Sequence, residues 1–419
     1  MGQLVYYCAG ADPNCLPAQN INAMLLNALD HGANDRKIKA AKQMCLSANS
    51  NHIMQDSSGY QILKAEEKGK LMTFDPNQPM KNTAKFLNLS TKHVMQVAAI
   101  HKPDIVIGLD FPIRKLKGEL QMQLEFLNKL PTNIQWAQES FAWKNALIPE
   151  AQYFQPIQCN NLEHLDIFFN KIRGVNFDGV SMPIRNLKLA DLALFLVSFY
   201  QRGIRKVHLL GTSSFLVIAM CTYLAGQMFE WVSLDSTTWR LAADKEEFLN
   251  LGDLSRRKLK TGIHIPDGEI NDCPCPFCRG QGFTAIQALL PRKDKVDLLR
   301  RHNWWAIDNL VADMWANNTD LIQLERALKA RSWNHRRVDD LIRILSTLIL
   351  LKDDDITMLQ SVLAPVLKSR KQSHSFRLSS SSVSHLRKPA KTSRQPTDTD
   401  CRSILSSEPP NKTEQIIKV

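Results

Sequence analysis

Residues 207–236 read VHLLGTSSFLVIAMCTYLAGQMFEWVSLDS, and this stretch indicates how the fold is built. Its two ends, Val207–Gly211 and Trp231–Ser236, are short apolar runs that finish in small or acidic residues, a pattern typical of buried strands. Ser214–Phe229 between them has the periodicity of a helix. A strand, a helix and a second strand in this order predict a parallel βαβ unit.

The same alternation continues along most of the chain. Five further runs are expected to be strands: Leu4–Ala9, His52–Asp56, Ile105–Asp110, Ala146–Gln152 and Phe177–Pro183. Helical segments between them include Ala84–Ile100, Glu119–Leu130 and Leu187–Gln201. Seven or eight such units in roughly 250 residues favour an α/β fold of the closed (β/α)8 type, the TIM barrel, over an open sheet. The eighth strand is the least clear, and we expect it at Thr261–Ile265.

Polar residues fall at or near the expected strand ends: Asp56, Asp110, Gln152, Asp178 and Asp235. In a barrel the carboxyl ends of the strands meet at one mouth, where active sites form. A single acidic residue at a strand end is more often the N-cap of the next helix. Several of them together predict a site, although Asp178 is expected to be mainly structural.

A cysteine cluster predicts a metal site. Cys273, Cys275 and Cys278 are followed, after 23 intervening residues, by His302. Three thiolates and one imidazole match a closed tetrahedral Zn²⁺ site with no open position, so the metal is expected to be structural. His264 and His335 are the alternative fourth ligands, and core cysteines beside an unrelated histidine are the alternative to a metal site.

The chain has 419 residues, and its composition divides it into four parts. We expect a catalytic barrel at 1–265, a zinc-binding subdomain at 266–310, a helical region at 311–367 and a disordered, Ser-rich basic tail at 368–419. The net charge is +12, of which the tail carries +7, so the folded part is only mildly basic. This balance favours an acidic polymer as partner, although a solvated surface would look similar.

Targeting signals are not evident. The longest apolar stretch, Phe215–Gly226, is shorter than the ~20 residues of a membrane span, and the first ten residues lack the features of a signal peptide. Nine cysteines are too few for a disulfide scaffold, and their clustering suits a reducing compartment. We therefore expect a cytoplasmic protein with no membrane partner.

Several motifs, in a consistent order from about Leu4 to Asn309, resemble those of the tRNA-guanine transglycosylases. Residues 55–61, QDSSGYQ, are similar to that family's Asp-Ser-Gly-Gly-Phe/Tyr-Gln signature. The other resembling segments are Gly108-Leu109-Asp110, Ala151-Gln152 (for Val-Gln), Phe177-Asp178-Gly179, Leu209-Leu210-Gly211-Thr212 (for Leu-Met-Gly-Val), Ser233–Arg240 (for Phe-Asp-Cys-Val-x-Pro-Thr-Arg) and the cysteine cluster with His302-Asn303.

The resemblance implies a TIM barrel with a zinc subdomain and exchange of a guanine base in a nucleic acid. It implies that Asp235 is the nucleophile and Asp56 the general acid and base. Substrate-binding roles fall to a further group: Asp110 and Gln152 for the heterocycle, Tyr60 and Leu210 for its two faces, and Gly211 beside them.

Two carboxylates also suit this chemistry on general grounds. Cleavage of an N-glycosidic bond builds positive charge on the sugar, which a carboxylate can stabilise or trap covalently at C1′. A second carboxyl group can protonate the departing base and deprotonate the incoming one, so two displacements retain the configuration. The target nucleotide must be flipped out or single-stranded for C1′ to be reached.

The chain departs from the tRNA enzymes after the Phe-Asp-Gly motif. Residues 180–185 read VSMPIR, where the family has a Gly-Gly loop that contacts the base, and Pro183 has no N–H to donate. The Pro-Thr-Arg segment is also reduced, and no PUA-like RNA-binding domain is recognised. These departures resemble the DNA-modifying branch, which inserts 7-deazaguanines such as 7-cyano-7-deazaguanine into DNA.

The leading hypothesis is therefore a DNA-guanine transglycosylase that uses free 7-deazaguanine base, with helper proteins that open the strands as further candidate partners. One alternative is a tRNA enzyme of the queuosine or archaeosine type. The other is a non-catalytic binding subunit that keeps the fold and the zinc, against which the presence of both Asp56 and Asp235 argues.

Basic residues supply candidate phosphate contacts. The main candidates are Arg256, Arg257 and Lys258, within the run Ser255–Lys260, and Arg240. Other candidates are Arg114, Lys115, Lys117, Lys260, Arg292, Lys293, Lys295, Arg300 and Arg301. Most basic runs in proteins are solvent-exposed surfaces that bind no ligand. Such a surface is therefore the alternative to phosphate binding here.

Overall fold

The structure, a computed structural model, describes most of the chain. The described residues are 2–18, 20–32, 34–68, 89–185, 187–259, 273–278, 283–288, 292–317, 320–332 and 334–372. No helix within these ranges is long and apolar enough to cross a membrane.

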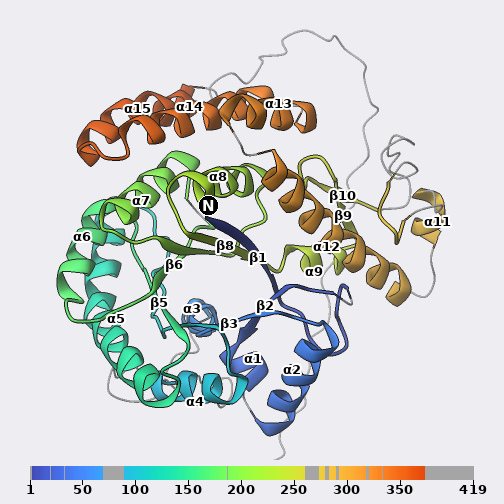
Figure 1. The fold of residues 1–419 in the computed structure, drawn as a ribbon, viewed down its shortest axis with the longest axis horizontal. Coiled ribbons are helices and arrows are strands. Elements are labelled where there is room, and N and C mark those ends of the chain that lie inside the picture. Colours follow the sequence, from blue (N-terminus) through green and yellow to red (C-terminus); the bar gives the residue numbers. More distant parts are fainter. Residues whose placement is uncertain are drawn as a thin grey trace, which may run out of the picture. The chain divides into compact units, whose positions relative to one another are not determined.

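Eight parallel strands form a closed barrel, which confirms the expected fold class (Figure 1). They pair in chain order, and the last strand pairs with the first. The strands are β1 (Gln3–Ala9), β2 (Ala23–Asn27), β3 (His52–Asp56), β4 (Ile105–Ile107), β5 (Gln152–Pro156), β6 (Gly179–Pro183), β7 (Lys206–Leu210) and β8 (Trp231–Ser236).

The sequence pattern missed one strand, and one of its strand predictions was wrong. The missed strand is β2, an apolar run that passes directly into a helix without a turn, and it completes the eight. The run Ala146–Gln152 is not a strand, because its first residues end a helix that continues through Pro131, and β5 begins only at Gln152. The expected strand Thr261–Ile265 lies outside the described residues, and the barrel closes without it.

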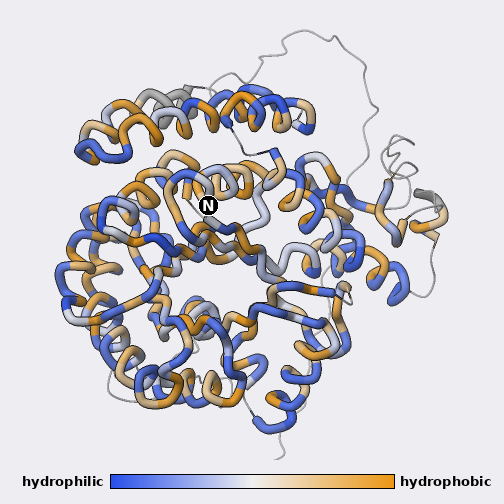
Figure 2. Tube along the Cα trace, viewed as in Figure 1, coloured by the Kyte–Doolittle hydropathy of each residue, from blue (hydrophilic) through white to orange (hydrophobic). Residues whose placement is uncertain are grey.

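Helices surround the barrel (Figure 1). Around the ring, hydrophobic and hydrophilic residues alternate along most helices, as expected where one face meets the strands and the other meets solvent (Figure 2). The ring consists of α1 (Ala28–Gly32), α2 (Asp35–Ser47), α4 (Thr91–His101), α5 (Glu119–Leu147), α6 (Leu162–Lys171), α7 (Leu189–Gln201) and α8 (Phe215–Gln227). Helix α3 (Gly59–Glu67) is seen inside this ring, next to β3 (Figure 1).

The C-terminal third packs against one side of this ring. It contains α9 (Thr238–Ala243), the antiparallel pair β9 (Glu247–Leu249) and β10 (Arg256–Lys258), α11 (Phe283–Ala288), α12 (Arg292–Ala316), α13 (Leu321–Arg331), α14 (His335–Leu351) and α15 (Ile356–Gln372). Helices α12 and α14 contact α8, and α14 also contacts α7. This cover explains why α7 and α8 are buried almost all round. Helix α12 runs across the expected boundary at residues 310 and 311 without a break.

Candidate active site

Three carboxylates lie at the carboxyl ends of barrel strands. Asp56 is the last residue of β3, Asp235 is the last but one of β8, and Asp110 follows β4 by three residues. Asp110 and Asp235 are each 6% exposed. Burial, together with the negative charges of Asp110 and Asp235, raises the pKa of Asp56 to about 7. The structure therefore brings together the three acids that are far apart in the sequence.

Asn27, the last residue of β2, orients the Asp56 carboxylate. Its Nδ2 donates to Asp56 Oδ2 over 3.0 Å, and the Ser58 N–H points to the same oxygen at 3.3 Å. The Asn27 side-chain oxygen accepts from Ser58 Oγ at 2.6 Å and from the N–H groups of Leu29 and Asp30 at 3.1 Å each. Because these donors hold the oxygen, the amide nitrogen must face Asp56. The sequence analysis missed Asn27 together with its strand.

Asp110 is held by two side-chain donors. Ser57 Oγ donates to Asp110 Oδ1 over 3.0 Å, and Gln158 Nε2 donates to Oδ2. The amide of Gln158 is fixed in turn, because its oxygen accepts from the Ile113 N–H at 3.2 Å. Burial raises the pKa of Asp110 to about 6, and the hydrogen bonds from Ser57 and Gln158 limit that rise. Gly59 also lies against Asp110, where an added Cβ would come within 2.2 Å of Oδ1.

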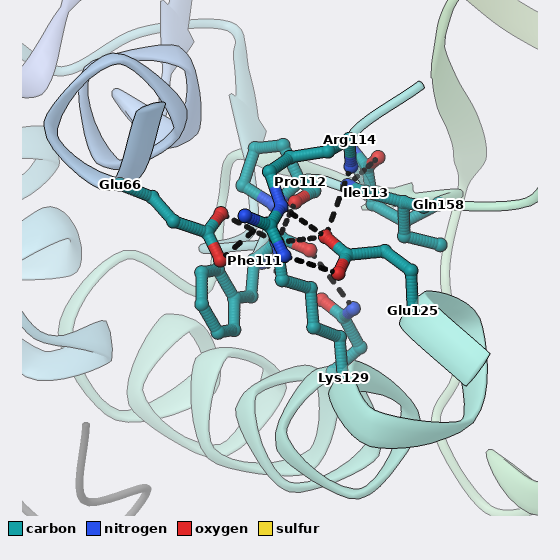
Figure 3. A network of polar contacts seen from close by, with 9 residues as sticks. Glu66, Phe111, Pro112, Ile113, Arg114, Glu125, Lys129 and Gln158 are labelled. Atoms are coloured by element: carbon teal, nitrogen blue, oxygen red, sulfur yellow. Dashed lines mark hydrogen bonds and ion pairs between the residues drawn. The ribbon is translucent and has the colours of Figure 1, made fainter. Parts of the chain in front are cut away.

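An ion-pair network holds the segment that follows Asp110 (Figure 3). Lys129 on α5 contacts Glu66 and Glu125 at 2.6 Å each and donates to the Pro112 carbonyl at 2.8 Å. Arg114 pairs with Glu125 at 2.7 Å. Burial would raise the pKa of Glu125, but the bonds from Arg114 and Lys129 outweigh it and lower the pKa to about 2. Arg114 was a candidate phosphate contact, but it pairs with the carboxylates of Glu66 and Glu125. Its role in the structure is therefore to hold the segment that follows Asp110.

Gln152 and Asp178 do not join the acids. Gln152 is the first residue of β5, at the opposite end of the barrel, and accepts from Lys206 Nζ at 3.2 Å. Asp178 precedes β6 and accepts from the Tyr153 N–H at 2.8 Å. Gln152 was expected at the carboxyl end of a strand, but β5 begins at the residue where the expected strand ended. Gln158, two residues after β5, occupies the place at the mouth that was expected for Gln152.

Tyr60 and Leu210 lie on opposite sides of the mouth, because Tyr60 follows β3 and Leu210 ends β7, four strands further round. Tyr60 is 47% exposed, and its hydroxyl accepts from Arg185 Nη1 at 3.2 Å. Gly211 has φ +81°, which favours glycine, and its N–H donates to Asp235 Oδ1 over 2.9 Å. Lys64 Nζ lies over the Tyr60 ring, 4.4 Å from its centroid.

The predicted phosphate contacts divide into two groups. Arg240 on α9 is half-buried and already has partners within the protein, since it donates to the Gly10 carbonyl at 2.6 Å and pairs with Asp12 at 2.9 Å. Arg256, Arg257 and Lys258 form the exposed strand β10, and Arg256 lies 3.8 Å from Glu247 on β9. The three exposed cations therefore remain candidates, while Arg240 ties the loop after β1 to α9.

The cysteine cluster forms a structural zinc site. The ligand atoms of Cys273, Cys275, Cys278 and His302 are buried and lie within 4.8 Å of one another. His302 Nδ1 is 3.6, 3.4 and 3.3 Å from the three sulfurs in that order. Tetrahedral Zn²⁺ with bonds of about 2.3 Å to sulfur and 2.0 Å to nitrogen places such atoms about 3.6 Å apart, so the four residues fit the ion.

The tautomer of His302 agrees with this role. Its Nε2 contacts the Leu249 carbonyl at 2.9 Å, which requires the proton on Nε2 and leaves Nδ1 free to bind metal. His335, an alternative ligand, contacts the Lys329 carbonyl instead, and His264 lies outside the described residues. Because four protein ligands close the coordination shell, the ion joins the Cys273–Cys278 segment to α12 and leaves no position for a substrate. The hydrogen bond from His302 to Leu249 links α12 to β9 as well.

Comparison with known proteins agrees with this geometry. The family model described as queuine tRNA-ribosyltransferase matches residues 18–317, which include all three carboxylates and the four zinc ligands. None of the individually curated proteins matches the chain significantly.

Proposed function

The chain belongs to the queuine tRNA-ribosyltransferase family of base-exchanging pentosyltransferases, and on this premise we propose that it replaces guanine in DNA by a 7-deazaguanine base. The observation that carries the proposal is the grouping of Asp56, Asp110 and Asp235 at one barrel mouth, where burial and the charges of the other two acids raise the pKa of Asp56. A strongly shifted pKa of this kind is characteristic of sites that move protons.

In the proposed reaction Asp235 is the nucleophile. One of its carboxylate oxygens forms a bond to C1′ as the bond from C1′ to N9 of guanine breaks, which leaves a covalent sugar ester. The incoming 7-deazaguanine then attacks C1′ through its own N9 and releases the Asp235 carboxylate. Two inversions retain the configuration at C1′, and the phosphodiester backbone is never cut.

Asp56 is assigned to both proton transfers. In its protonated form it supplies a proton to the departing guanine, and the carboxylate that remains takes the N9 proton of the incoming base. A pKa of about 7 suits this double role, because both forms are well populated near neutral pH. The amide of Asn27 and the N–H of Ser58 support the charged form when it appears.

Asp110 and Gln158 are assigned to the heterocycle. A guanine-type edge presents N–H donors beside a carbonyl acceptor, and a carboxylate next to an amide offers the complementary groups. Tyr60 and Leu210 would cover the two faces of the ring, since they stand on opposite sides of the mouth. Stacking of this kind contributes about 1–3 kcal/mol per base.

The preference for DNA rests on the sequence departures. Pro183 ends β6 at the mouth, where the tRNA enzymes carry the Gly-Gly loop, so a backbone N–H contact is lost there. After the matched residues, the described part of the chain contains only the helices α13, α14 and α15. The second candidate is exchange into tRNA, which the name of the family, queuine tRNA-ribosyltransferase, favours.

The test offers one preparation of protein three acceptors: duplex DNA, single-stranded DNA and unmodified tRNA, each with 7-cyano-7-deazaguanine. After digestion, the modified nucleoside is measured by mass spectrometry. We expect product in DNA, and better exchange in single strands than in duplex would indicate that helper proteins open the duplex. Product in tRNA alone would reject the DNA assignment. Asp235→Asn, which keeps the shape of the side chain, should form no covalent adduct, and full activity of this variant would remove Asp235 as the nucleophile.

A further inference from the structure

A buried histidine lies directly beneath the proposed nucleophile. His208 is fully buried on β7, faces the inside of the barrel, and places its Nε2 at 3.4 Å from Asp235 Oδ1. In strand register His208 is level with Ser233, and Asp235 is level with Tyr7. The imidazole packs edge-on against the Tyr7 ring, at 88° and 5.8 Å between centroids, which restricts its rotation.

The surroundings of the ring decide which nitrogen carries a proton. His208 Nδ1 lies 2.9 Å from Ser233 Oγ, a hydroxyl that can either donate or accept. If Nε2 had no proton, its lone pair would face the Asp235 carboxylate in a buried place, and two acceptors in contact are costly there. With the proton on Nε2, Ser233 can donate to Nδ1, and Nε2–H faces Asp235 Oδ1 across the 3.4 Å contact, which lacks hydrogen-bond geometry in the unliganded site. A doubly protonated ring also carries a proton on Nε2.

The two oxygens of Asp235 are therefore not equivalent. Oδ1 meets the Gly211 N–H at 2.9 Å and Nε2 of His208 at 3.4 Å. Both donors approach the same oxygen, which leaves Oδ2 as the one available to a substrate. The contact of 3.4 Å is longer than a good N–H···O bond of about 2.9 Å. Bonds of this kind are often long in an unliganded site and shorten in the complex.

We propose that His208 is a positioning residue: through Nε2–H it holds Oδ1 of Asp235 and so directs Oδ2 at C1′. This inference rests on the proposed role of Asp235 as nucleophile. When the sugar ester breaks in the second displacement, negative charge returns to the carboxylate, and the bonds from Gly211 and His208 stabilise it as a leaving group. Both displacements should then depend on His208, although it touches neither the sugar nor the base.

The test compares His208→Leu with His208→Gln in the exchange assay. Leu fills the space without a donor, whereas the side-chain amide of Gln can place an N–H near the position of Nε2. We expect Leu to lower kcat about 10- to 100-fold, the usual effect of losing a hydrogen bond to a charged group, with KM for base and nucleic acid within about threefold. Gln should restore most of kcat.

A matched control separates this role from packing. His101→Leu makes the same change at another buried histidine, on α4, whose Nδ1 contacts Gln55. It should leave kcat within about threefold of the wild-type value. An unchanged kcat in His208→Leu, an equal loss in His101→Leu, or a loss that Gln does not restore would each overturn the inference. Failure of the proposed function is distinguishable, because the wild-type protein itself would then exchange no base in any acceptor.

Discussion

Replacing Asp56 by Asn should stabilise the folded protein while it abolishes base exchange. The Asp56 side chain is half-buried and its carboxyl lies beside two other acids, so folding opposes its ionisation and raises its pKa from 3.8 to about 7. A raised carboxyl pKa contributes stability that is complete below the unfolded value and is lost as the pH rises through the folded value. At pH 8 the wild-type protein therefore folds with a carboxylate that its site disfavours, and Asn removes that charge.

The size of the effect follows from the shift. Each pKa unit corresponds to about 1.36 kcal/mol, so a rise from 3.8 to about 7 amounts to about 4 kcal/mol at pH 8 and less than about 2 kcal/mol at pH 5. Asn keeps an oxygen that can accept from Asn27 Nδ2 and the Ser58 N–H, so few contacts are lost. The gain should thus be larger at pH 8 than at pH 5 by about 2.5 kcal/mol.

Urea unfolding of both proteins at pH 5 and pH 8, followed by tryptophan fluorescence, measures this difference. Asp166→Asn is the control, because Asp166 is an exposed carboxylate on α6 whose ion pair with Arg202 should contribute no more than about 1 kcal/mol at either pH. A stabilisation of Asp56→Asn that is equal at both pH values would refute the electrostatic reasoning. A destabilised variant would show that the carboxylate itself is needed to hold the mouth together.

Three further changes test other parts of the structure. Gln158→Leu removes a donor to Asp110 and should raise KM for the base about 10- to 100-fold, whereas Gln152→Leu at the far end of the barrel should leave KM unchanged, as steady-state kinetics will show. Cys275→Ala should release zinc, detected by a colorimetric chelator, and lower the unfolding midpoint, because the closed site joins the Cys273–Cys278 segment to α12. Lys129→Met removes the more buried of the two cations that face Glu66 and Glu125; because Arg114 still pairs with both, the loss in urea unfolding should stay below the about 3–5 kcal/mol of an uncompensated buried charge.

The fold could be predicted from the sequence because most strands are short apolar runs between helices of ordinary periodicity. The exceptions have physical causes. Strand β2 passes into α1 with no intervening turn residues, so its five residues resemble the start of a helix. Helix α5 continues through Pro131, a residue that normally ends a helix, and this shifted the expected strand away from β5.

The site was predicted less completely, because a sequence motif can indicate the acids but not the residues that contact them in the folded protein. The order of the motifs was sufficient to predict Asp56, Asp110 and Asp235 as site residues and to predict the four zinc ligands. The role of Asn27 depends on a missed strand, and that of Gln158 depends on where β5 ends. His208 stands alone in an apolar run, and only the register of β7 against β8 places it below Asp235. Contacts of this kind arise from tertiary structure and leave no local pattern.

The charges of the barrel mouth also bear on how a nucleic acid would approach. Among the described residues, the three carboxylates at the mouth have no Lys or Arg partner. Glu66 and Glu125, in contrast, form ion pairs with Lys129 and Arg114. Carboxylates without cationic partners at the barrel mouth stabilise positive charge on a sugar at C1′. They also repel the phosphates that flank the target nucleotide. The backbone must then be held by cations set apart from the acids. Strand β10, with Arg256, Arg257 and Lys258 exposed beside the zinc site, supplies such a group. Neutralising Arg256 and Lys258 together should therefore weaken nucleic-acid binding and flatten its dependence on salt, without changing the rate of exchange at saturation.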